Sequence, residues 1–255
     1  MTDIQNTISI VLEGVGASIE ERRELEYFRI HQDRYNRVVN EILDMGLPKG
    51  SRILDVGCYP PHMFKALKEL GFDMYGISSS HEPVKNKHVI ISNIETDKLP
   101  FRPDFFDLII CSEVMEHLIV SPLIYLEKFR RVLKKNGRLL ITTPNAAGLH
   151  KRIPLMLGRS SYFPLTELYN TKPGDGSVYH RHNREFTIDE LCEVVEKAGF
   201  TVQKQTTIGV YGPFRKKLVQ HPLPKRVVRG IAFFLTKLYS PFQDTLLLIA
   251  GLQKR

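Results

Sequence analysis

Cysteine is scarce in this sequence, and its spacing carries no sign of metal or disulfide chemistry. The three cysteines, Cys58, Cys111 and Cys192, are odd in number and lie far apart. No CxxC pair and no Cys/His spacing typical of zinc is present. We therefore expect no disulfide framework and no bound metal, and a reducing, cytoplasmic compartment.

Several other signatures are missing. Without a G-x-x-x-x-G-K-[ST] run or a G-x-G-x-x-G run, a P-loop nucleotidase and a nicotinamide dehydrogenase are both disfavoured. The apolar piece Thr245–Leu252 is only eight residues long, far short of the ~18 needed to span a bilayer. The polar beginning, with Asp3, Gln5 and Asn6, lacks the plan of a signal peptide. With 42% apolar and 25% charged residues, we expect an ordinary soluble globular protein.

Acidic residues are almost absent from the C-terminal part of the chain. Residues 209–255 hold nine Lys/Arg and one acid, Asp244, whereas the two signs balance over residues 1–208. The C-terminal segment therefore carries the whole formal net charge of +8. A localised basic excess indicates an anionic partner, which is a membrane surface, a phosphorylated substrate or nucleic acid.

Short apolar strands alternate with helices through most of the chain. Such alternation predicts a parallel sheet with crossover helices. Two helix starts carry a capping box, Ser18 with Glu21 and Thr187 with Glu190. The expected strands are 52–56, 73–77, 88–91, 107–111, 137–142 and 201–206, and the expected helices are 18–46, 62–70, 121–133 and 187–198.

Residues 143–186 break this alternation. They are rich in Gly, Pro, His, Arg and aromatic residues, and a long irregular insertion in an α/β domain is usually functional or disordered. The insertion follows the strand at 137–142, which places it at the carboxyl edge of the sheet, where such folds bind ligands.

Three motifs occur in a fixed order along the expected sheet. They are ILDVGC (53–58), LPF (99–101) followed by FDLIICSEVMEHL (106–118), and GRLLITTPN (137–145). In this order and strand context they resemble the class I S-adenosylmethionine-dependent methyltransferases of the small-molecule, glycan and lipid type, similar to methyltransferase domain 11. The resemblance covers roughly residues 50–206. It implies an α/β Rossmann-like three-layer sandwich with a mostly parallel seven-stranded sheet, and S-adenosyl-L-methionine as cofactor.

The resemblance also implies which residues hold the cofactor. Asp55 and Gly57 match positions near its methionine part, and a glycine there lets the backbone approach a ligand closely. Asn93, Ile94 and Glu95 match the positions that hold the adenine ring, and the end of the fourth strand matches the region near the sulfonium. The full set expected at the cofactor is Asp55, Gly57, Cys58, Tyr59, Ser78, Asn93, Ile94, Glu95, Cys111, Ser112 and Glu113.

The sequence departs from the family pattern at two places. Tyr59 and Pro61 stand where the family has later glycines, so the loop is stiffer and has fewer backbone donors. Ser78 stands where an acid usually binds the ribose, and a neutral hydroxyl makes a weaker hydrogen bond than a carboxylate. Glu82 is the alternative source of that carboxylate. These departures imply weak cofactor binding or a non-catalytic relative.

On the acceptor side, His117 matches a histidine of related O-methyltransferases. It is expected either to act as a base, because its pKa lies near working pH, or to hydrogen-bond a loop carbonyl. In relatives that act on glycans, quinone precursors and lipid-linked molecules, a run similar to His180–Thr187 ends the insertion. Arg184 suits an acceptor carboxylate or phosphate. The expected catalytic residues are His117, His182 and Arg184, with Asn145, His150, His180 and Arg181 as further acceptor-side candidates.

The C-terminal segment has two interpretations. Apolar residues between Val227 and Leu238 share one helical face with basic neighbours, which favours an amphipathic helix on a membrane surface or docking on a lipid carrier. Alternatively the segment packs on the domain, with TLLLIAGLQKR (245–255) as the last strand. We divide the chain into an N-terminal helical lid (1–46), a cofactor-binding domain (47–208) and a C-terminal segment (209–255).

Three functions follow from these observations. The first is S-adenosylmethionine-dependent O-methylation of a small or lipid-linked acceptor, such as a glycan, by an enzyme that is cytoplasmic or peripheral at the membrane. The second is a non-catalytic binding module. The third, a nucleic-acid methyltransferase, is disfavoured, because CSEV (111–114) stands where such enzymes carry an Asn/Asp-Pro-Pro-Tyr/Phe-like clamp for a flipped base.

Overall fold

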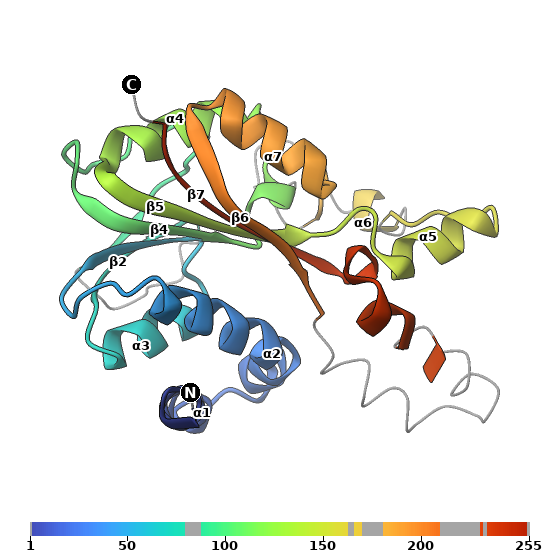
Figure 1. Cartoon of the computed structure of the whole chain (residues 1–255), viewed down its shortest axis with the longest axis horizontal. Helices are drawn as coiled ribbons and strands as arrows, with labels where there is room; N and C mark the ends of the chain where they lie inside the picture. The colour runs from blue at the N-terminus through green and yellow to red at the C-terminus, as the bar shows by residue number, and fades with distance from the viewer. Residues whose placement is uncertain are drawn as a thin grey trace.

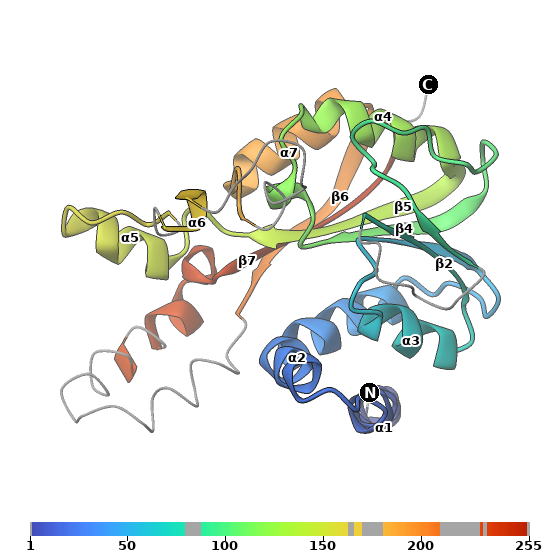
Figure 2. The same ribbon diagram turned by 180° about the vertical axis from the view of Figure 1, so that it is seen from behind.

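A computed structural model shows three layers, with helices on both faces of one sheet (Figures 1 and 2). It describes residues 2–79, 88–162, 166–169, 181–209, 230–231 and 234–253. Within them, no helix is long and apolar enough to cross a membrane.

The sheet has seven strands in the order β3-β2-β1-β4-β5-β7-β6 among the described residues. The first five in this order are parallel, and β7 runs antiparallel to both β5 and β6. This confirms the expected mostly parallel Rossmann-like sheet. The strands are β1 (Arg52–Val56), β2 (Asp73–Ser78), β3 (Val89–Ile91), β4 (Phe106–Ser112), β5 (Leu133–Pro144), β6 (Phe200–Ile208) and β7 (Thr245–Leu252).

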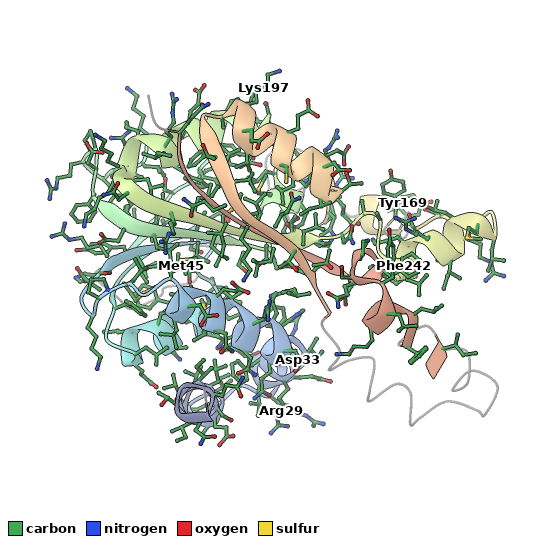
Figure 3. The ribbon with its side chains drawn as sticks, in the orientation of Figure 1. Arg29, Asp33, Met45, Tyr169, Lys197 and Phe242 are labelled. Carbon is green, nitrogen blue, oxygen red and sulfur yellow. The ribbon has the colours of Figure 1, made fainter. Side chains whose placement is uncertain are left out.

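The apolar periodicity of each helix decides which face of the sheet it covers. Helices α1 (Thr2–Ala17), α2 (Arg22–Asp44) and α3 (His62–Glu69) pack on one face, and α4 (Pro122–Val132) and α7 (Ile188–Lys197) on the other. Successive side chains of β1 point to opposite faces of the sheet. Ile53 packs against the layer of α1, α2 and α3, and Leu54 packs against the layer of α4 and α7. On α2, Arg29 and Asp33 lie on the exposed side (Figure 3).

The N-terminal region differs from the expected single helix over 18–46. It forms two helices, because Ile8, Leu12 and Val15 give the first 17 residues a buried face of their own. The prediction of a capping box at Ser18 and Glu21 is wrong. The Ser18 hydroxyl donates to the carbonyl of Val15 at the end of α1, and α2 starts after Glu21 without a side-chain cap. The Thr187–Glu190 capping box is confirmed at the start of α7.

Helix α2 is part of the layer beside the sheet. Its buried face packs against α1 and α3, in the same apolar cluster as Ile53 and Leu108 of the sheet. The closing movement expected of a lid stays a prediction.

The C-terminal end of the chain completes the sheet. Residues 245–252, which the sequence division places with the C-terminal segment, form β7 between β5 and β6. Seven of the eight residues of β7 are buried, as expected for a strand covered on both faces. For residues 245–252 the structure therefore agrees with the second of the two interpretations, in which TLLLIAGLQKR supplies a strand of the domain.

The insertion 143–186 is partly helical. It contains α5 (Leu149–Met156) and α6 (Thr166–Tyr169), which lie beyond one end of the sheet together with the 310-helical turn η3 (Ser240–Phe242) (Figure 1). Asn145 joins the two regions, because its amide donates to the carbonyls of Pro241 and Gln243 at 3.0 and 2.8 Å.

Candidate functional site

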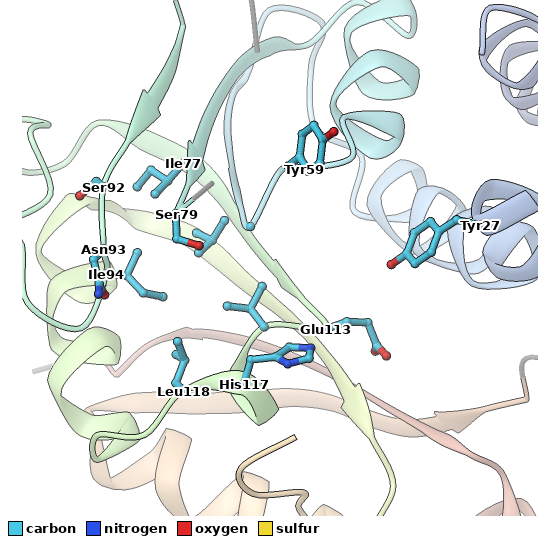
Figure 4. Close-up of a pocket in the computed structure, with 13 residues that line it drawn as sticks. Tyr27, Tyr59, Ile77, Ser79, Ser92, Asn93, Ile94, Glu113, His117 and Leu118 are labelled. Atoms are coloured by element: carbon cyan, nitrogen blue, oxygen red, sulfur yellow. The ribbon is translucent and has the colours of Figure 1, made fainter. Parts of the chain in front are cut away.

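A cavity of about 260 Å³ opens at the carboxyl ends of β1, β2 and β4. In a parallel sheet this edge is where ligands bind. Figure 4 shows Tyr27 and Tyr59 on one side of it and Ser92, Asn93 and Ile94 on the other. Of the residues predicted from the sequence, the cavity brings together Gly57, Tyr59, Asn93, Ile94, Glu113 and His117.

The turn after β1 brings backbone close to the cavity. Gly57 has φ +75°, and a Cβ there would lie 2.5 Å from a methyl of Val114. Only glycine fits this conformation and this space without strain. The amides of Gly57 and Cys58 both donate to the carbonyl of Ile77, at 2.8 and 3.1 Å. The turn is therefore held by β2, and these two amides serve the fold rather than a ligand.

The opposite wall is a short loop after β3 whose side chains hold one another. The Asp97 carboxylate accepts from the Asn93 amide at 2.8 Å, and the Asn93 side-chain oxygen accepts from the amide of Glu95 at 2.9 Å. The Glu95 carboxylate accepts from the amides of Ile119 and Val120, each at 2.7 Å. Asn93 and Ile94 thus line the cavity, while Glu95 fixes the loop before α4.

Several residues expected at the cofactor lie below the cavity rather than in its lining. Asp55, Cys58 and Cys111 are buried within or just after their strands. Ser78 is also buried, and the cavity is lined instead by Ser79, the next residue after β2. The reason is the strand period of two, which turns neighbouring side chains to opposite faces. Glu82, the alternative carboxylate, lies outside the described residues.

Burial raises the pKa of two groups that do not line the cavity, Asp55 and Cys111. It raises the pKa of Asp55 to about 7, because the carboxylate is removed from water. Burial also raises the pKa of the Cys111 thiol, with smaller contributions from nearby carboxylates. Cys111 therefore stays a neutral thiol in the core, and its expected contact with the cofactor stays a prediction.

Glu113 is held by a residue that sequence reasoning missed. Its carboxylate forms an ion pair of 3.0 Å with Arg34 of α2, and Arg34 is 5% exposed. It also accepts from the Thr142 hydroxyl at 3.0 Å, and that hydroxyl hydrogen-bonds Ser112 at 2.7 Å. Glu113 has φ +56°, a conformation rare for residues other than glycine. Non-glycine residues in this conformation cluster at functional sites.

The turn after β4 is tied to the end of the insertion. This 310-helical turn, η1 (Met115–His117), contacts residues 181–184 through backbone and side-chain hydrogen bonds and through a pair of histidine rings. The amide of Asn183 donates to the Glu116 carbonyl at 2.6 Å, and its side chain donates to the His117 carbonyl at 2.7 Å. The His117 ring hydrogen-bonds the carbonyl of Arg181 at 3.0 Å, and its centroid lies 4.9 Å from that of His182.

His117 thus makes the loop-carbonyl hydrogen bond that was one of its two expected roles. This bond does not exclude the other role. A carbonyl only accepts, so the proton sits on Nδ1 and Nε2 keeps its lone pair. His117 lines the cavity, and we find the two predicted histidines next to each other although 65 positions separate them in the sequence.

The remaining acceptor-side candidates that the structure describes do not line the cavity. Arg184 is an exposed residue whose guanidinium bonds Glu190 at 2.9 Å and lies over the ring of Phe186. Asn145 anchors the insertion, and burial lowers the pKa of His150 in α5. His180 lies outside the described residues. The structure therefore does not bring Arg184 to the site where its expected role would place it.

The sequence matches a family model described as a methyltransferase domain over residues 27–205. The match takes in most of the sheet, the cavity and both histidines. The chain belongs to the methyltransferase-domain family.

Curated relatives and solved structures agree with this assignment. A ubiquinone biosynthesis O-methyltransferase from Aeromonas salmonicida is 25% identical over 62% of this chain and 66% of its own length. A probable S-adenosylmethionine-dependent methyltransferase from Mycolicibacterium smegmatis is 28% identical over 72% and 62%. The matches thus span a little under two thirds of each relative. In fold, the chain resembles a SAM-dependent methyltransferase from Archaeoglobus fulgidus, with a TM-score of 0.54 at 17% identity over 87% of this chain and 96% of that one.

The cofactor of this methyltransferase-domain protein is S-adenosylmethionine. The cavity residues fit such a molecule. At Gly57 the bare backbone borders the cavity, and a Cβ there would collide with the Val114 methyl. Ile77, Ile94 and Leu118 offer apolar surface suited to an adenine ring, and Ser79 and Asn93 offer polar groups for its edge or for ribose hydroxyls.

Proposed function

We propose that this protein transfers the methyl group of S-adenosylmethionine to an oxygen of a small or lipid-linked acceptor that enters beside His117. The observation that carries the proposal is that His117 lines the cofactor cavity and meets His182 of the insertion, with a ring-centroid distance of 4.9 Å. An acceptor held at the insertion would therefore lie next to both histidines.

The residues of the chain have separate tasks in this reaction. S-adenosylmethionine supplies an electrophilic methyl group on its sulfonium. Gly57, Asn93 and Glu113 bind and orient that molecule. The hydroxyl proton of the acceptor passes to Nε2 of His117, whose Nδ1 proton is held by the Arg181 carbonyl. Alignment of donor and acceptor supplies much of the rate in such a displacement.

One of the named relatives supports oxygen as the methylated atom. The protein from Aeromonas salmonicida is an O-methyltransferase of ubiquinone biosynthesis. At 25% identity its acceptor is a lead for this chain rather than an assignment. We therefore propose hydroxylated acceptors as the first class to test, with and without a lipid chain.

A lipid-linked acceptor agrees with the surface next to the site. Ile153 to Leu157, at the end of α5, are mostly exposed, and Met156 is 85% exposed. Phe234 and Leu238, in the helical residues 234–238, are 59% and 67% exposed. Exposed apolar side chains of this kind suit a membrane, and the basic excess in the sequence of residues 209–255 would favour one with anionic lipid.

One observation favours a non-catalytic module as the second candidate. The two amides of the Gly57 turn bond Ile77, and Tyr59 takes the place of a later glycine. Weak cofactor binding is the expected sign of such a module.

Two measurements test the proposal. Calorimetric titration with S-adenosylmethionine should give micromolar binding. Methyl transfer to a panel of hydroxylated aromatic, glycan and prenylated acceptors should then fall at least about 100-fold in His117→Ala, the usual range for a catalytic base, with cofactor affinity unchanged. Equal turnover in His117→Ala would exclude the base. Absence of cofactor binding by folded protein would favour the non-catalytic module.

A further inference from the structure

A buried carboxylate oxygen faces a histidine beside the cavity. Glu116 is fully buried, and its Oε2 accepts from the Thr143 hydroxyl at 2.9 Å. Its Oε1 has no hydrogen-bond partner among the described residues and lies 3.9 Å from Nε2 of His117. An unpartnered buried carboxylate oxygen is costly, and such groups in native proteins call for an ion or a water.

His182 completes a cluster of three groups that can bind a metal. Glu116, His117 and His182 each offer one ligand atom, and these atoms all lie within 4.8 Å of one another. The two histidines are part-exposed, with 29% and 22% of the side chain accessible, whereas Glu116 forms the buried base of the cluster. The two histidines are therefore accessible to solvent, and His117 also lines the cavity.

Each of the three side chains is held in orientation by a hydrogen bond to another residue outside the cluster. His117 Nδ1 donates to the Arg181 carbonyl at 3.0 Å, and His182 Nδ1 bonds Glu185 at 2.8 Å. Lys151 holds Glu185 in turn, also at 2.8 Å. With both protons on Nδ1, the lone pairs sit on the Nε2 atoms. Metal-binding histidines almost always have such an outer partner, a carbonyl or a carboxylate on the other ring nitrogen.

We propose that Glu116, His117 and His182 form a binding site for one first-row divalent ion of the zinc type. Two imidazole nitrogens and one carboxylate are a common ligand set for Zn²⁺ with a fourth position open. Mg²⁺ and Ca²⁺ prefer oxygen ligands, so they suit this cluster less well. Ligands of a tetrahedral ion lie roughly 3.3 Å apart, and shifts of about an ångström in the histidine rings would close the site. From the cysteine spacing we expected no bound metal, but that argument does not apply to a cluster of glutamate and histidine without cysteine.

The use of this ion in catalysis rests on the proposed function, whereas its binding does not. An acceptor hydroxyl that takes the open position would have its pKa lowered by the ion, as bound water does. Its proton leaves to water, the oxygen forms a bond to the methyl carbon, and the carbon–sulfur bond breaks. The products are the methyl ether and S-adenosylhomocysteine. With the ion bound, Nε2 of His117 is a ligand, so the proton that His117 would accept in the ion-free reaction goes to water instead.

Zinc affinity of the purified full chain tests the site directly. Competition with a chromophoric chelator measures Zn²⁺, and the visible absorption of Co²⁺ reports the ligand set. His182→Ala removes one ligand, Glu116→Gln keeps the shape of another, and His150→Ala is the control from α5. Titration of each protein with S-adenosylhomocysteine checks that the cofactor site is folded, because neither His182 nor Glu116 lines the cavity.

We expect one Zn²⁺ per chain in wild type and in His150→Ala. We expect at least about tenfold weaker binding in both ligand variants, since even outer-partner changes cost 10–100-fold, with S-adenosylhomocysteine affinity retained. Equal zinc affinity in wild type and His182→Ala would overturn the site, as would no zinc binding by wild type. A further outcome is that wild type binds zinc, the ligand variants lose it, and wild type methylates no acceptor. That result would overturn the proposed function but would leave the zinc site established.

Discussion

Single residues decide whether the cavity can accept a cofactor, and Gly57 is the clearest case. Its φ of +75° and the nearby Val114 methyl exclude a side chain on two separate grounds. Gly50 offers a matched comparison, because its φ is +78° but a Cβ there would meet nothing within 4 Å.

We expect Gly57→Ala to weaken S-adenosylhomocysteine binding at least tenfold, because Val114 must move into the cavity that both residues line. Gly50→Ala carries the same backbone penalty, about 1–2 kcal/mol of stability, and should leave the affinity unchanged. Calorimetric titration and urea unfolding of the two variants measure these effects. Equal loss of affinity in both would show that the effect is general destabilisation and not the collision with Val114.

For single residues, the sequence predicts the site residues that directly follow strands and misses those that only tertiary packing brings to the site. Gly57, Asn93 and His117 follow strands, so their place at the sheet edge can be read from the order of motifs. Arg34 and Glu116 cannot be found in this way. Arg34 reaches the site only because α2 packs beside the sheet, and Glu116 becomes important only when His182 is brought to it from the insertion.

Between elements, one buried ion pair connects α2 to the end of β4. Arg34 comes from the buried face of α2, and Glu113 follows β4 directly. Removing one partner of a buried pair leaves the other charge uncompensated in a poorly solvated place.

We expect Arg34→Gln to lower the free energy of unfolding by about 3 kcal/mol and to weaken cofactor binding, because Glu113 loses its fixed orientation. Arg37→Gln is the control, since Arg37 is 48% exposed and its partner Glu41 keeps Lys204 at 2.6 Å. Arg37→Gln should lower the free energy of unfolding by less than about 1 kcal/mol. Chemical unfolding and titration measure both quantities. Equal costs in the two variants would contradict a special role for the Arg34 pair.

The layer of α1, α2 and α3 also makes the protein sensitive to acid. His62 at the start of α3 is completely buried among the rings of Tyr27, Phe28 and Tyr35. Burial lowers the pKa of His62 from 6.5 to about 4, with a smaller contribution from Lys65. Below pH 6.5 the unfolded chain therefore binds a proton that the folded chain refuses, and stability falls as the pH drops toward 4.

Replacement of this histidine should flatten the acid limb of the stability curve. We expect His62→Leu to lose less stability than wild type between pH 6.5 and pH 4, by at most about 3 kcal/mol. Burial gives His31 a similar lowered pKa of about 4, so part of the slope should remain. Urea unfolding at a series of pH values measures the slope. Parallel curves for the two proteins would contradict the assignment to His62.

The elements themselves are largely predictable, and the errors fall where tertiary packing decides. The six strands between 52 and 206 follow from short apolar runs, and all are present within two residues at most ends, β5 being longer. The Ser18–Glu21 pattern failed because α1 takes Ser18 for its own end. The position of β7 inside the sheet depends on pairing with β5, which local periodicity does not reveal.

Across the whole molecule, exposed apolar groups gather at the end that carries α5, α6 and η3. Tyr169 and Phe242 lie at this end (Figure 3), and Phe242 packs under the guanidinium of Arg152. The helical residues 234–238 continue the apolar surface. The contact of a membrane with this end would bring the insertion, and the site beside it, toward lipid-linked acceptors.

We expect the protein to bind vesicles that contain anionic lipid, and to bind them less as salt is added. The double variant Phe234→Glu/Leu238→Glu should bind at least tenfold more weakly. Ile10→Glu changes a side chain that is 69% exposed on α1 and should bind as wild type does. Vesicle flotation measures the difference. Equal binding by all three proteins would place the contact elsewhere.

The place of β7 also determines the order in which the protein is built during translation. Among the described residues β6 pairs with β7 alone, and β7 follows it after residues 209–244. A ribosome therefore delivers β6 well before the strand that connects it to β5. Until β7 is made, β5 and β6 both present unpaired strand edges, and such edges favour aggregation. The nascent chain is thus most in need of a chaperone just before β7 is synthesised.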